Sequence, residues 1–512
     1  MSRFGESTNK TMLKKQKIII IVFVALFVVL TILYFAVIAP LTKDDGEETT
    51  EPVETDVGES RTPQNYWLIF PQVEREDIKS IEVHNKYGTY KFYRNKEDKF
   101  VIEGFENLAY DQEQFSQLVV STGFTISQVK VTENPTEEQL KEYGFYDDPA
   151  YYILTTKSGT VHKVIIGYKI IAGGGYYAMY EGRKTIYVLE KSLEKVVLAP
   201  VVDMVAPLVT AGIKSNEYFN IDNFKIYHHD KLFFAAQNLT SEELKERETT
   251  ALVASKVTHP GDYTPSNIYD EVRLGLVNYV GDAVVALGLT EENLKEYGLS
   301  DPPYTITYNY KDDSYKLIAS EPVDGYYYVG TYLFNTIVKV PEEDFKFLSW
   351  SLLKWIDNSA FQRSITFVAS IKVETPQFTE TFRLTHLDKS SNPNLIVKGD
   401  LCGVIDGSDE VYNFRQFYKS LLTVQIEGEA PLTDEEKAEL IANDKRCILK
   451  FTVTTLGGNV TEYGFYRYST RRCLLTVNGV GQFYVVIDVP RKIAGSAQKV
   501  IKGETIDPQE KY

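Results

Sequence analysis

Two Ser-x-x-Lys sequences are the nearest approach of this chain to a known catalytic pattern. They run from Ser192 to Lys195 and from Ser351 to Lys354, and penicillin-binding enzymes place a serine nucleophile and its lysine at this spacing. That chemistry also requires a Ser-x-Asn sequence and a Lys-Ser/Thr-Gly strand further along the chain. Here Lys157-Ser158-Gly159 precedes both sequences. Because the order is wrong and the four-residue pattern is common, we interpret both sequences as structural.

Metal-binding and phosphate-binding patterns are equally weak. His228 and His229 are adjacent, but neighbouring residues on a strand point to opposite faces and seldom share one ion, so we expect a hairpin turn there. The three glycines at 173–175 lack the following Lys-Ser/Thr of a phosphate loop and lie between expected strands. The patterns G-x-S-x-G, H-E-x-x-H and C-x-x-C do not occur. We therefore predict no catalytic residue, no metal site and no cofactor.

Composition excludes two further classes of protein. The formal charge of −16 over 512 residues argues against a nucleic-acid partner, which requires a basic face. Three cysteines are too few for a disulfide scaffold. Cys447 and Cys473 begin two expected strands of one meander, so a disulfide between them is geometrically possible; the sequence leaves the pairing of Cys402, Cys447 and Cys473 open, and we favour free thiols.

Tyrosine is unusually frequent, at 36 residues. It gathers in two expected strands at matching places in the chain, and a tyrosine that faces outward can stack on a sugar ring or a peptide. The alternative is that aromatic residues favour strands and pack beneath helices, and we favour this second interpretation. The candidate ligand-facing residues are Tyr176, Tyr177, Tyr180, Tyr326, Tyr327 and Tyr328.

An uncharged apolar run of 22 residues, 18–39, follows a basic N-terminus, and as a helix it can cross a hydrocarbon core of about 30 Å. Residues 1–17 carry five basic side chains and one acidic one, whereas residues 40–61 carry two basic and eight acidic ones. Because positive charge stays on the cytoplasmic side, we predict a single-pass cell-membrane protein with its N-terminus inside and its C-terminal domains outside. The alternative is a cleaved signal peptide, whose apolar region is shorter; Pro40 after the best cleavage site disfavours it.

A second apolar stretch, 196–212, contains Asp203, Pro200 and Pro207. A membrane span would bury a carboxylate and two helix-breaking prolines in lipid. We therefore predict a buried, broken helix that closes the first folded unit.

An internal repeat organises the remainder of the chain. Residues 136–149 (TEEQLKEYGFYDDP) and 290–303 (TEENLKEYGLSDPP) are identical at ten of fourteen positions. Each copy predicts a short helix with a threonine N-cap, a glycine C-cap and a proline before the next strand. Asp147 and Asp301 recur beside the prolines, which suggests turn capping. The repeat markers are Thr136, Tyr143, Gly144, Pro149, Thr290, Tyr297, Gly298 and Pro303.

Each copy is preceded by an amphipathic helix, near 111–122 and 265–278, and followed by a β-meander. A degenerate third copy fits the last part of the chain, with Thr433 as the N-cap and Leu440-Ile441 in place of the Tyr-Gly pair. Antiparallel hairpins and meanders with inserted helices indicate an α+β fold. We predict seven segments: a cytoplasmic basic segment (1–17), a transmembrane helix (18–39), an acidic disordered linker (40–64), repeat units at 65–212 and 213–358, a degenerate unit at 359–503, and a tail (504–512).

The capped helix ending in Glu-Tyr-Gly, the Asp-x-Pro step, the strand–turn–strand and the later Gly-Tyr-Tyr strand resemble the bacterial family called domain of unknown function 4340. The resemblance is strong over 65–205 and 215–357 and weak in the last third. It implies an anchored protein of the bacterial cell envelope, and some relatives are encoded beside ABC-type export or gliding-type transporter genes. It implies no catalytic residues.

Two functions from different classes follow. The favoured one is a non-enzymatic, extracytoplasmic membrane-anchored protein that binds or scaffolds envelope components, with ABC-type transporter subunits or cell-wall components as partners. The alternative is a cell-wall polymer hydrolase or another envelope enzyme. A hydrolase would need two carboxylates about 5–10 Å apart in a deep cleft.

Overall fold

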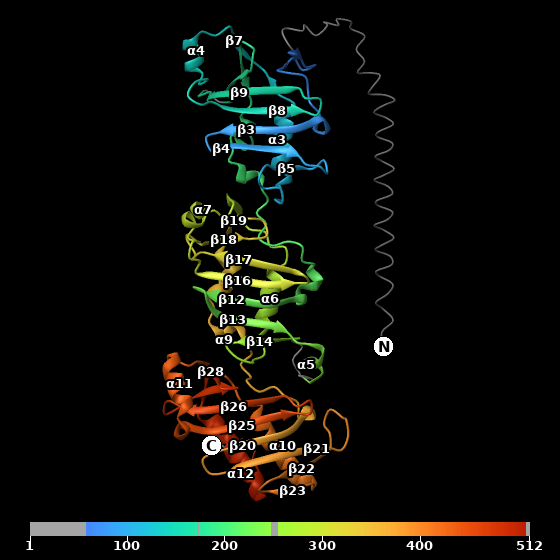
Figure 1. The fold of residues 1–512 in the computed structure, drawn as a ribbon, viewed down its shortest axis with the longest axis vertical. Coiled ribbons are helices and arrows are strands. Elements are labelled where there is room, and N and C mark those ends of the chain that lie inside the picture. Colours follow the sequence, from blue (N-terminus) through green and yellow to red (C-terminus); the bar gives the residue numbers. More distant parts are fainter. Residues whose placement is uncertain (1–57, 172–173, 247–253, 508–512) are drawn as a thin grey trace, which may run out of the picture. The chain divides into compact units, whose positions relative to one another are not determined.

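The computed structural model describes residues 58–171, 174–246 and 254–507. The predicted cytoplasmic segment and transmembrane helix lie outside the described residues, as do most of the predicted linker and residues 508–512. Within the described ranges, no helix combines the length and the apolar composition needed to cross a membrane. The described chain is a mixed α/β protein with several antiparallel sheets and few helices (Figure 1).

A small three-stranded sheet belongs to a compact unit of its own. It consists of β1 (Ser60–Arg61), β2 (Trp67–Leu68) and β6 (Ile126–Ser127), which pair antiparallel with β2 in the middle. The guanidinium carbon of Arg61 lies 3.9 Å from the centroid of the Trp67 ring, a cation–π contact. The prediction that the linker is disordered as far as residue 64 is therefore wrong at its end, because strand pairing and this ring contact order Ser60 and Arg61.

Three larger sheets share one strand order. In each, a three-strand hairpin unit pairs through its first strand with the first strand of a four-strand meander, and a short strand flanks the last meander strand. Sheet 1 runs in the order β5 (Phe100–Ile102), β4 (Gly88–Arg94), β3 (Ile78–Asn85), β8 (Ala150–Thr156), β9 (Val161–Lys169), β10 (Tyr176–Tyr180), β11 (Thr185–Leu189) and β7 (Lys130–Glu133). Sheet 2 runs in the order β14 (Ser255–His259), β13 (Lys231–Asn238), β12 (Ile221–His228), β16 (Tyr304–Tyr310), β17 (Asp313–Ala319), β18 (Tyr326–Thr331), β19 (Thr336–Pro341) and β15 (Ala283–Leu287).

Sheet 3 repeats this order and adds one strand at its first edge. It runs β23 (Gly403–Ile405), β22 (Leu395–Gly399), β21 (Thr379–His386), β20 (Val368–Glu374), β25 (Cys447–Thr455), β26 (Val460–Arg467), β27 (Arg472–Val477), β28 (Val480–Val486) and β24 (Gly428–Glu429). The last third of the chain therefore does form a four-stranded meander after its short helix, although its sequence has diverged.

One amphipathic helix covers a face of each large sheet: α3 (Gln112–Gly123), α6 (Asn267–Gly275) and α10 (Ser408–Leu421). An aromatic side chain of each helix packs on an aromatic side chain of the second hairpin strand. The ring pairs are Phe115–Phe92 at 5.1 Å, Tyr269–Phe234 at 6.1 Å and Phe417–Phe382 at 5.2 Å. Burying such side chains gives each sheet its own core.

A short capped helix covers the other face: α4 (Glu137–Glu142), α7 (Glu291–Glu296) and α11 (Asp434–Ala442). Their N-caps are Thr136, Thr290 and Thr433, and each threonine hydroxyl accepts the backbone N–H three residues later at 3.2 Å, as the sequence predicts. Gly144 and Gly298 have φ of +84° and +70°, which confirms the predicted left-handed C-caps.

The stretch 196–212 differs from its prediction. Val196, Met204 and Val209 are buried as expected, but its one helical piece is the four-residue 3-10 turn η4 (Val201–Met204). Pro200 and Pro207 remove two backbone donors from so short a segment, which therefore cannot continue as a helix. The prediction of a broken helix is wrong in this respect.

The remaining elements are short or follow the meanders. They are η2 (Arg75–Asp77), η3 (Lys191–Lys195), η5 (Ser215–Asn220), α5 (Ser241–Glu246), α8 (Glu342–Phe345), η6 (Lys346–Ser349), α9 (Leu352–Trp355), η7 (Ile365–Phe367), η8 (Asp444–Arg446) and α12 (Asp488–Lys502). The segments after β11 and β19 are broken turns, whereas α12 after β28 is a full amphipathic helix.

Candidate functional site

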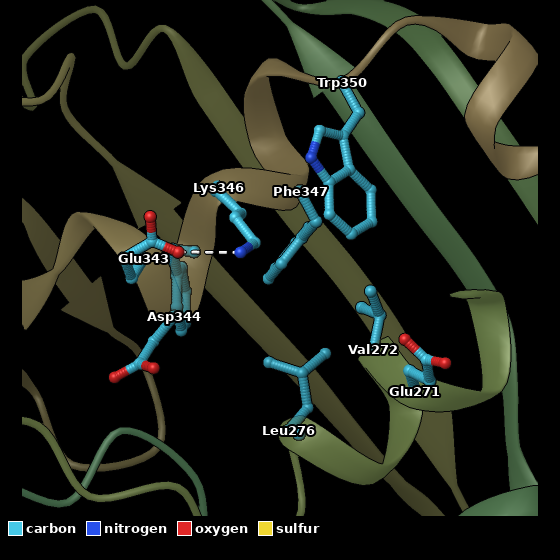
Figure 2. Close-up of a pocket in the computed structure, with 10 residues that line it drawn as sticks. Glu271, Val272, Leu276, Glu343, Asp344, Lys346, Phe347 and Trp350 are labelled. Atoms are coloured by element: carbon cyan, nitrogen blue, oxygen red, sulfur yellow. Dashed lines mark hydrogen bonds and ion pairs between the residues drawn. The ribbon is translucent and has the colours of Figure 1, made fainter.

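A half-open hollow beside sheet 2 is a candidate site in the described part of the chain, and we call it the α6 hollow. It lies between the second half of α6 and the segment that contains α8 and η6 (Figure 2). Its volume is about 140 Å³. Ten residues line it: Glu271, Val272, Gly275, Leu276, Glu343, Asp344, Phe345, Lys346, Phe347 and Trp350.

The floor of the hollow follows from the periodicity of α6. Val272 and Leu276 are four residues apart, so they lie on one side of the helix, and both are buried, as are Phe345 and Phe347. Gly275 is exposed and also lines the hollow, and a Cβ built at this position would meet no atom within 4 Å. The floor is therefore apolar, and the position of Gly275 beside it has room for a side chain.

Trp350 forms one wall of the hollow. Its ring centroid lies 6.5 Å from that of Phe347 and 5.8 Å from that of Trp355, and Trp355 is fully buried. Trp350 itself is partly exposed. Figure 2 shows the indole beside Phe347, above Val272 and Glu271 of α6.

Carboxylates dominate the rim. Glu343 pairs with Lys346 at 2.7 Å, and this hydrogen bond lowers the pKa of Glu343 and raises that of Lys346. Asp344 accepts a hydrogen bond of 2.7 Å from the Tyr279 hydroxyl. Glu271 is exposed on α6. Three carboxylates and one ammonium group therefore belong to the residues that line the hollow, and its rim carries an excess of negative charge at neutral pH.

An aromatic wall, an apolar floor and an acidic rim suit a group with an aliphatic body and a positive end. A cation over a tryptophan face gains about 0.5–1 kcal/mol at an exposed site and more when it loses water. The apolar part gains about 0.8 kcal/mol for each methylene that it buries. No group of three or more metal-ligating side chains occurs in the described ranges.

None of the tyrosines singled out from the sequence lines the α6 hollow. Tyr177 and Tyr328 lie beneath the short capped helices, where their rings contact Tyr143 at 4.5 Å and Tyr297 at 5.0 Å. Tyr327 is 1 % exposed, so it cannot reach a ligand at the surface.

The three other candidate tyrosines are partly exposed and have intramolecular partners. The Tyr176 hydroxyl donates to Glu194 at 2.7 Å, and the Tyr180 hydroxyl lies 3.1 Å from Nδ1 of His162. The ammonium of Lys339 lies 3.8 Å from the centroid of the Tyr326 ring. The structure therefore spreads the six tyrosines over both faces of two sheets, and a ligand-facing role for the exposed ones stays a prediction.

The structure places the histidine pair in a turn and places Cys447 and Cys473 on strands that are not neighbours. β12 ends at His228, and His229 and Asp230 have φ of +43° and +60°, which confirms the predicted turn. The three cysteines are free. Cys447 and Cys473 lie on either side of β26, opposite Tyr466 and Arg467; two strand spacings of about 4.8 Å exceed the reach of a disulfide.

The sequence contains one signal that could have pointed to the hollow, namely a difference in charge between the two repeat copies. The segment after β19 begins Glu342-Glu343-Asp344, whereas the segment after β11 begins Glu190-Lys191-Ser192. A change of charge between two copies marks a position that the shared fold does not dictate. Glu271 and Gly275 have the counterparts Gln117 and Ser121 at the constant offset of 154 residues.

Comparison with known proteins gives one family. Domain of unknown function (DUF4340) matches residues 101–260, which run from β5 of sheet 1 to β14 of sheet 2 and include the first capped helix. The α6 hollow lies beyond the matched residues. No curated protein and no solved structure matches the chain.

Proposed function

We propose that this chain is a non-enzymatic, extracytoplasmic membrane-anchored binding protein of the bacterial cell envelope. Its α6 hollow takes up one lysine or arginine side chain of a partner protein. The observation that carries the proposal is the meeting of an aromatic wall, an apolar floor and an acidic rim around a space of about 140 Å³.

The size of the hollow selects a single side chain. An apolar cavity of about 150 Å³ holds one benzene-sized group, whereas pockets for larger ligands measure about 300–1,000 Å³. A lysine or arginine side chain has an aliphatic stem that fits the floor beside Val272 and Leu276. Its charged end then lies at a rim that carries Glu271 on one side and Asp344 on the other (Figure 2).

The architecture around the hollow supports presentation of surfaces. Three sheets of one strand order follow each other in the chain, and we propose that all three are copies of the DUF4340 repeat. Residues 18–39 would anchor them as a single membrane span, with residues 58–507 outside the cell. ABC-type transporter subunits and cell-wall components are the partners to test first.

The alternative, a hydrolase of cell-wall polymer, receives less support from the hollow. A glycosidase needs a carboxyl group with a raised pKa to protonate the leaving oxygen. Lys346 instead lowers the pKa of Glu343. The hollow also has room for about one ring, whereas a hydrolase of a polymer must seat sugars on both sides of the bond that it cleaves.

Tryptophan signals test the hollow directly. The chain has three tryptophans, so the full-length protein labelled with ¹⁵N-tryptophan in an uncharged detergent gives one indole N–H signal each for Trp67, Trp350 and Trp355. We expect n-butylammonium, which reproduces a lysine side chain, to shift the Trp350 signal and to leave the Trp67 signal in place. n-Butanol at equal concentration is the uncharged control. Equal responses to the amine and the alcohol would contradict a cation site.

Two rim variants sharpen this test. Glu271→Gln removes a rim charge and should weaken the binding of n-butylammonium. Lys346→Met removes the competing ammonium, frees Glu343, and should strengthen it. If both variants change the affinity in the same direction, the charge of the rim does not control binding.

The location is tested separately. Protease added to intact wall-stripped cells should remove residues 65–512 and leave the first 17 residues protected. The charge step across residues 18–39 motivates this expectation. Protection of the large domain would refute the proposed location.

A further inference from the structure

Five arginines gather at one end of sheet 3, and we call this cluster the arginine end. Arg446 directly precedes β25, and Arg467 ends β26. Arg471 directly precedes β27, and Arg472 is its first residue. Arg491 lies in the first turn of α12.

The strand register brings them together. Cys447 pairs with Tyr466, so the neighbouring Arg446 comes level with Arg467, and Arg467 pairs with Cys473. The backbone carbonyl of Arg471 accepts the N–H of Ile487 at 2.9 Å, which brings the start of α12 to the same end.

Little in the described structure neutralises this charge. All five side chains belong to exposed residues. Arg491 lies 3.8 Å from Asp488, and Arg467 donates through Nε to the Ser469 carbonyl at 3.1 Å. Within residues 58–171, 174–246 and 254–507, no carboxylate forms an ion pair with Arg446 or Arg471. In a chain of formal charge −16, such a cluster is a local reversal of sign.

The cluster occupies both faces of the sheet end. Arg467 shares a face with its pairing partner Cys473, and the adjacent Arg472 points to the other face. There the guanidinium carbon of Arg472 lies 4.5 Å from the centroid of the Tyr484 ring. A flat bilayer contacts a surface from one side, whereas a flexible chain can follow charges around an edge.

The turn between the second and third strands of the meander differs in its residue types among the three sheets. The turn between β17 and β18 contains Glu321 and Asp324, and the turn between β9 and β10 contains Ile170, Ile171 and glycines. The turn between β26 and β27 is the basic member of the three. Because the strand order is common to all three sheets, the fold itself does not require arginine at this turn.

We propose that the arginine end binds a flexible extracytoplasmic polymer that carries phosphodiester groups. Guanidinium groups bind phosphate oxygens through paired, charge-assisted hydrogen bonds. The guanidinium groups of Arg446 and Arg471 form no ion pair in the described structure and can make such contacts. The other three arginines provide further positive charge at the same end of sheet 3. This inference concerns sheet 3 and does not depend on the α6 hollow of sheet 2.

Binding of fluorescent poly(glycerol phosphate) to the full-length protein in an uncharged detergent tests the proposal by anisotropy. The double variant Arg446→Glu with Arg471→Glu should lose at least tenfold in affinity. Because binding releases counterions, log affinity should fall linearly with log salt, and the variant should show a shallower slope. The matched control, Lys389→Glu with Lys419→Glu, changes the net charge equally at two exposed positions, one in the connection between β21 and β22 and one on α10. It should stay within twofold of the wild type.

Further arms decide the chemistry. Poly-glutamate of equal charge, inorganic phosphate and vesicles of phosphatidylglycerol should all bind more weakly than the polymer. Equal losses in the two double variants, stronger binding to vesicles or to poly-glutamate, or no polymer binding at 150 mM salt would each overturn the proposal. If the glutamate variant fails to fold by circular dichroism, Arg446→Gln with Arg471→Gln takes its place, with a loss of at least threefold expected.

Discussion

Gly275 offers a way to close the α6 hollow without touching its charges. It is the last residue of α6 and lines the hollow. A Cβ at this position would meet no atom within 4 Å, and the residue is not among those with positive φ. Both Gly275→Ala and Gly275→Leu should therefore fold, and they differ in how much of the hollow they fill.

The two substitutions should separate stability from binding. Gly275→Ala removes backbone freedom from the unfolded chain and should raise the free energy of unfolding by about 0.5–1 kcal/mol. The leucine side chain should also exclude part of the ligand's stem from the floor. Each excluded methylene costs about 0.8 kcal/mol of binding free energy, so two excluded methylenes correspond to about a fifteenfold loss of affinity.

The assay is the titration of the Trp350 indole signal with n-butylammonium, accompanied by denaturant unfolding of each variant. Gly275→Ala serves as the matched control, since it changes the same position and leaves most of the hollow open. Undiminished binding by a folded Gly275→Leu variant would refute the assignment of the hollow as the site. Equal loss of binding in both variants would show that the substitution acts through the helix and not through the space.

Two further predictions concern stability. Gly298→Ala should lower the free energy of unfolding by about 1 kcal/mol, because the residue has a positive φ. Gly144→Ala should lower the free energy of unfolding, measured with denaturant, by clearly more. Its Cβ would come within 2.7 Å of the backbone nitrogen of Tyr168, whereas the nearest atom to Gly298 is 3.9 Å away; equal costs would contradict this reasoning. Glu217, hydrogen-bonded chiefly to Lys311, has its pKa lowered to about 2, so its stabilising contribution is present above about pH 4.5 and is lost as the pH falls through about 2. Thermal unfolding from pH 5 to pH 2 should show a weaker pH dependence in Glu217→Gln, and an unchanged profile would contradict the lowered pKa.

Local signals in the sequence were sufficient for the capped helices and for their ends. A threonine followed by acidic residues determines where a helix begins, and Gly144 and Gly298 mark where two of the helices end. Thr433 could be placed in the last third without its Tyr-Gly pair because an N-cap depends on neighbours within one turn. The sequence did not reveal that helices cover both faces of each sheet. That packing depends on contacts between residues distant in the chain, such as the ring contact of Tyr143 with Tyr177, 34 positions later.

The α6 hollow could not be predicted from sequence for the same physical reason. Its two walls are about 70 residues apart in the chain, and their approach depends on how α6 packs on sheet 2. In the sequence, Gly275 falls inside the helix expected near 265–278 and gives no sign that it lines a hollow. After β11 the sequence led to too much predicted helix. The apolar run at 196–212 was predicted to be a broken helix, but Pro200 and Pro207 restrict it to a short turn.

Where the three sheets differ is more informative about function than what they share. The shared positions, such as Thr136 and Thr290, keep caps and turns that any copy of the fold needs. Charged residues that differ between the sheets lie at positions that the fold does not constrain. Examples are Glu343 beside the α6 hollow of sheet 2 and Arg471 in the turn of sheet 3. A cationic group for the first and a phosphodiester chain for the second are opposite in sign, so one ligand cannot satisfy both. If both proposals hold, the chain connects two different partners, and a variant that closes the hollow should leave polymer binding at the arginine end unchanged.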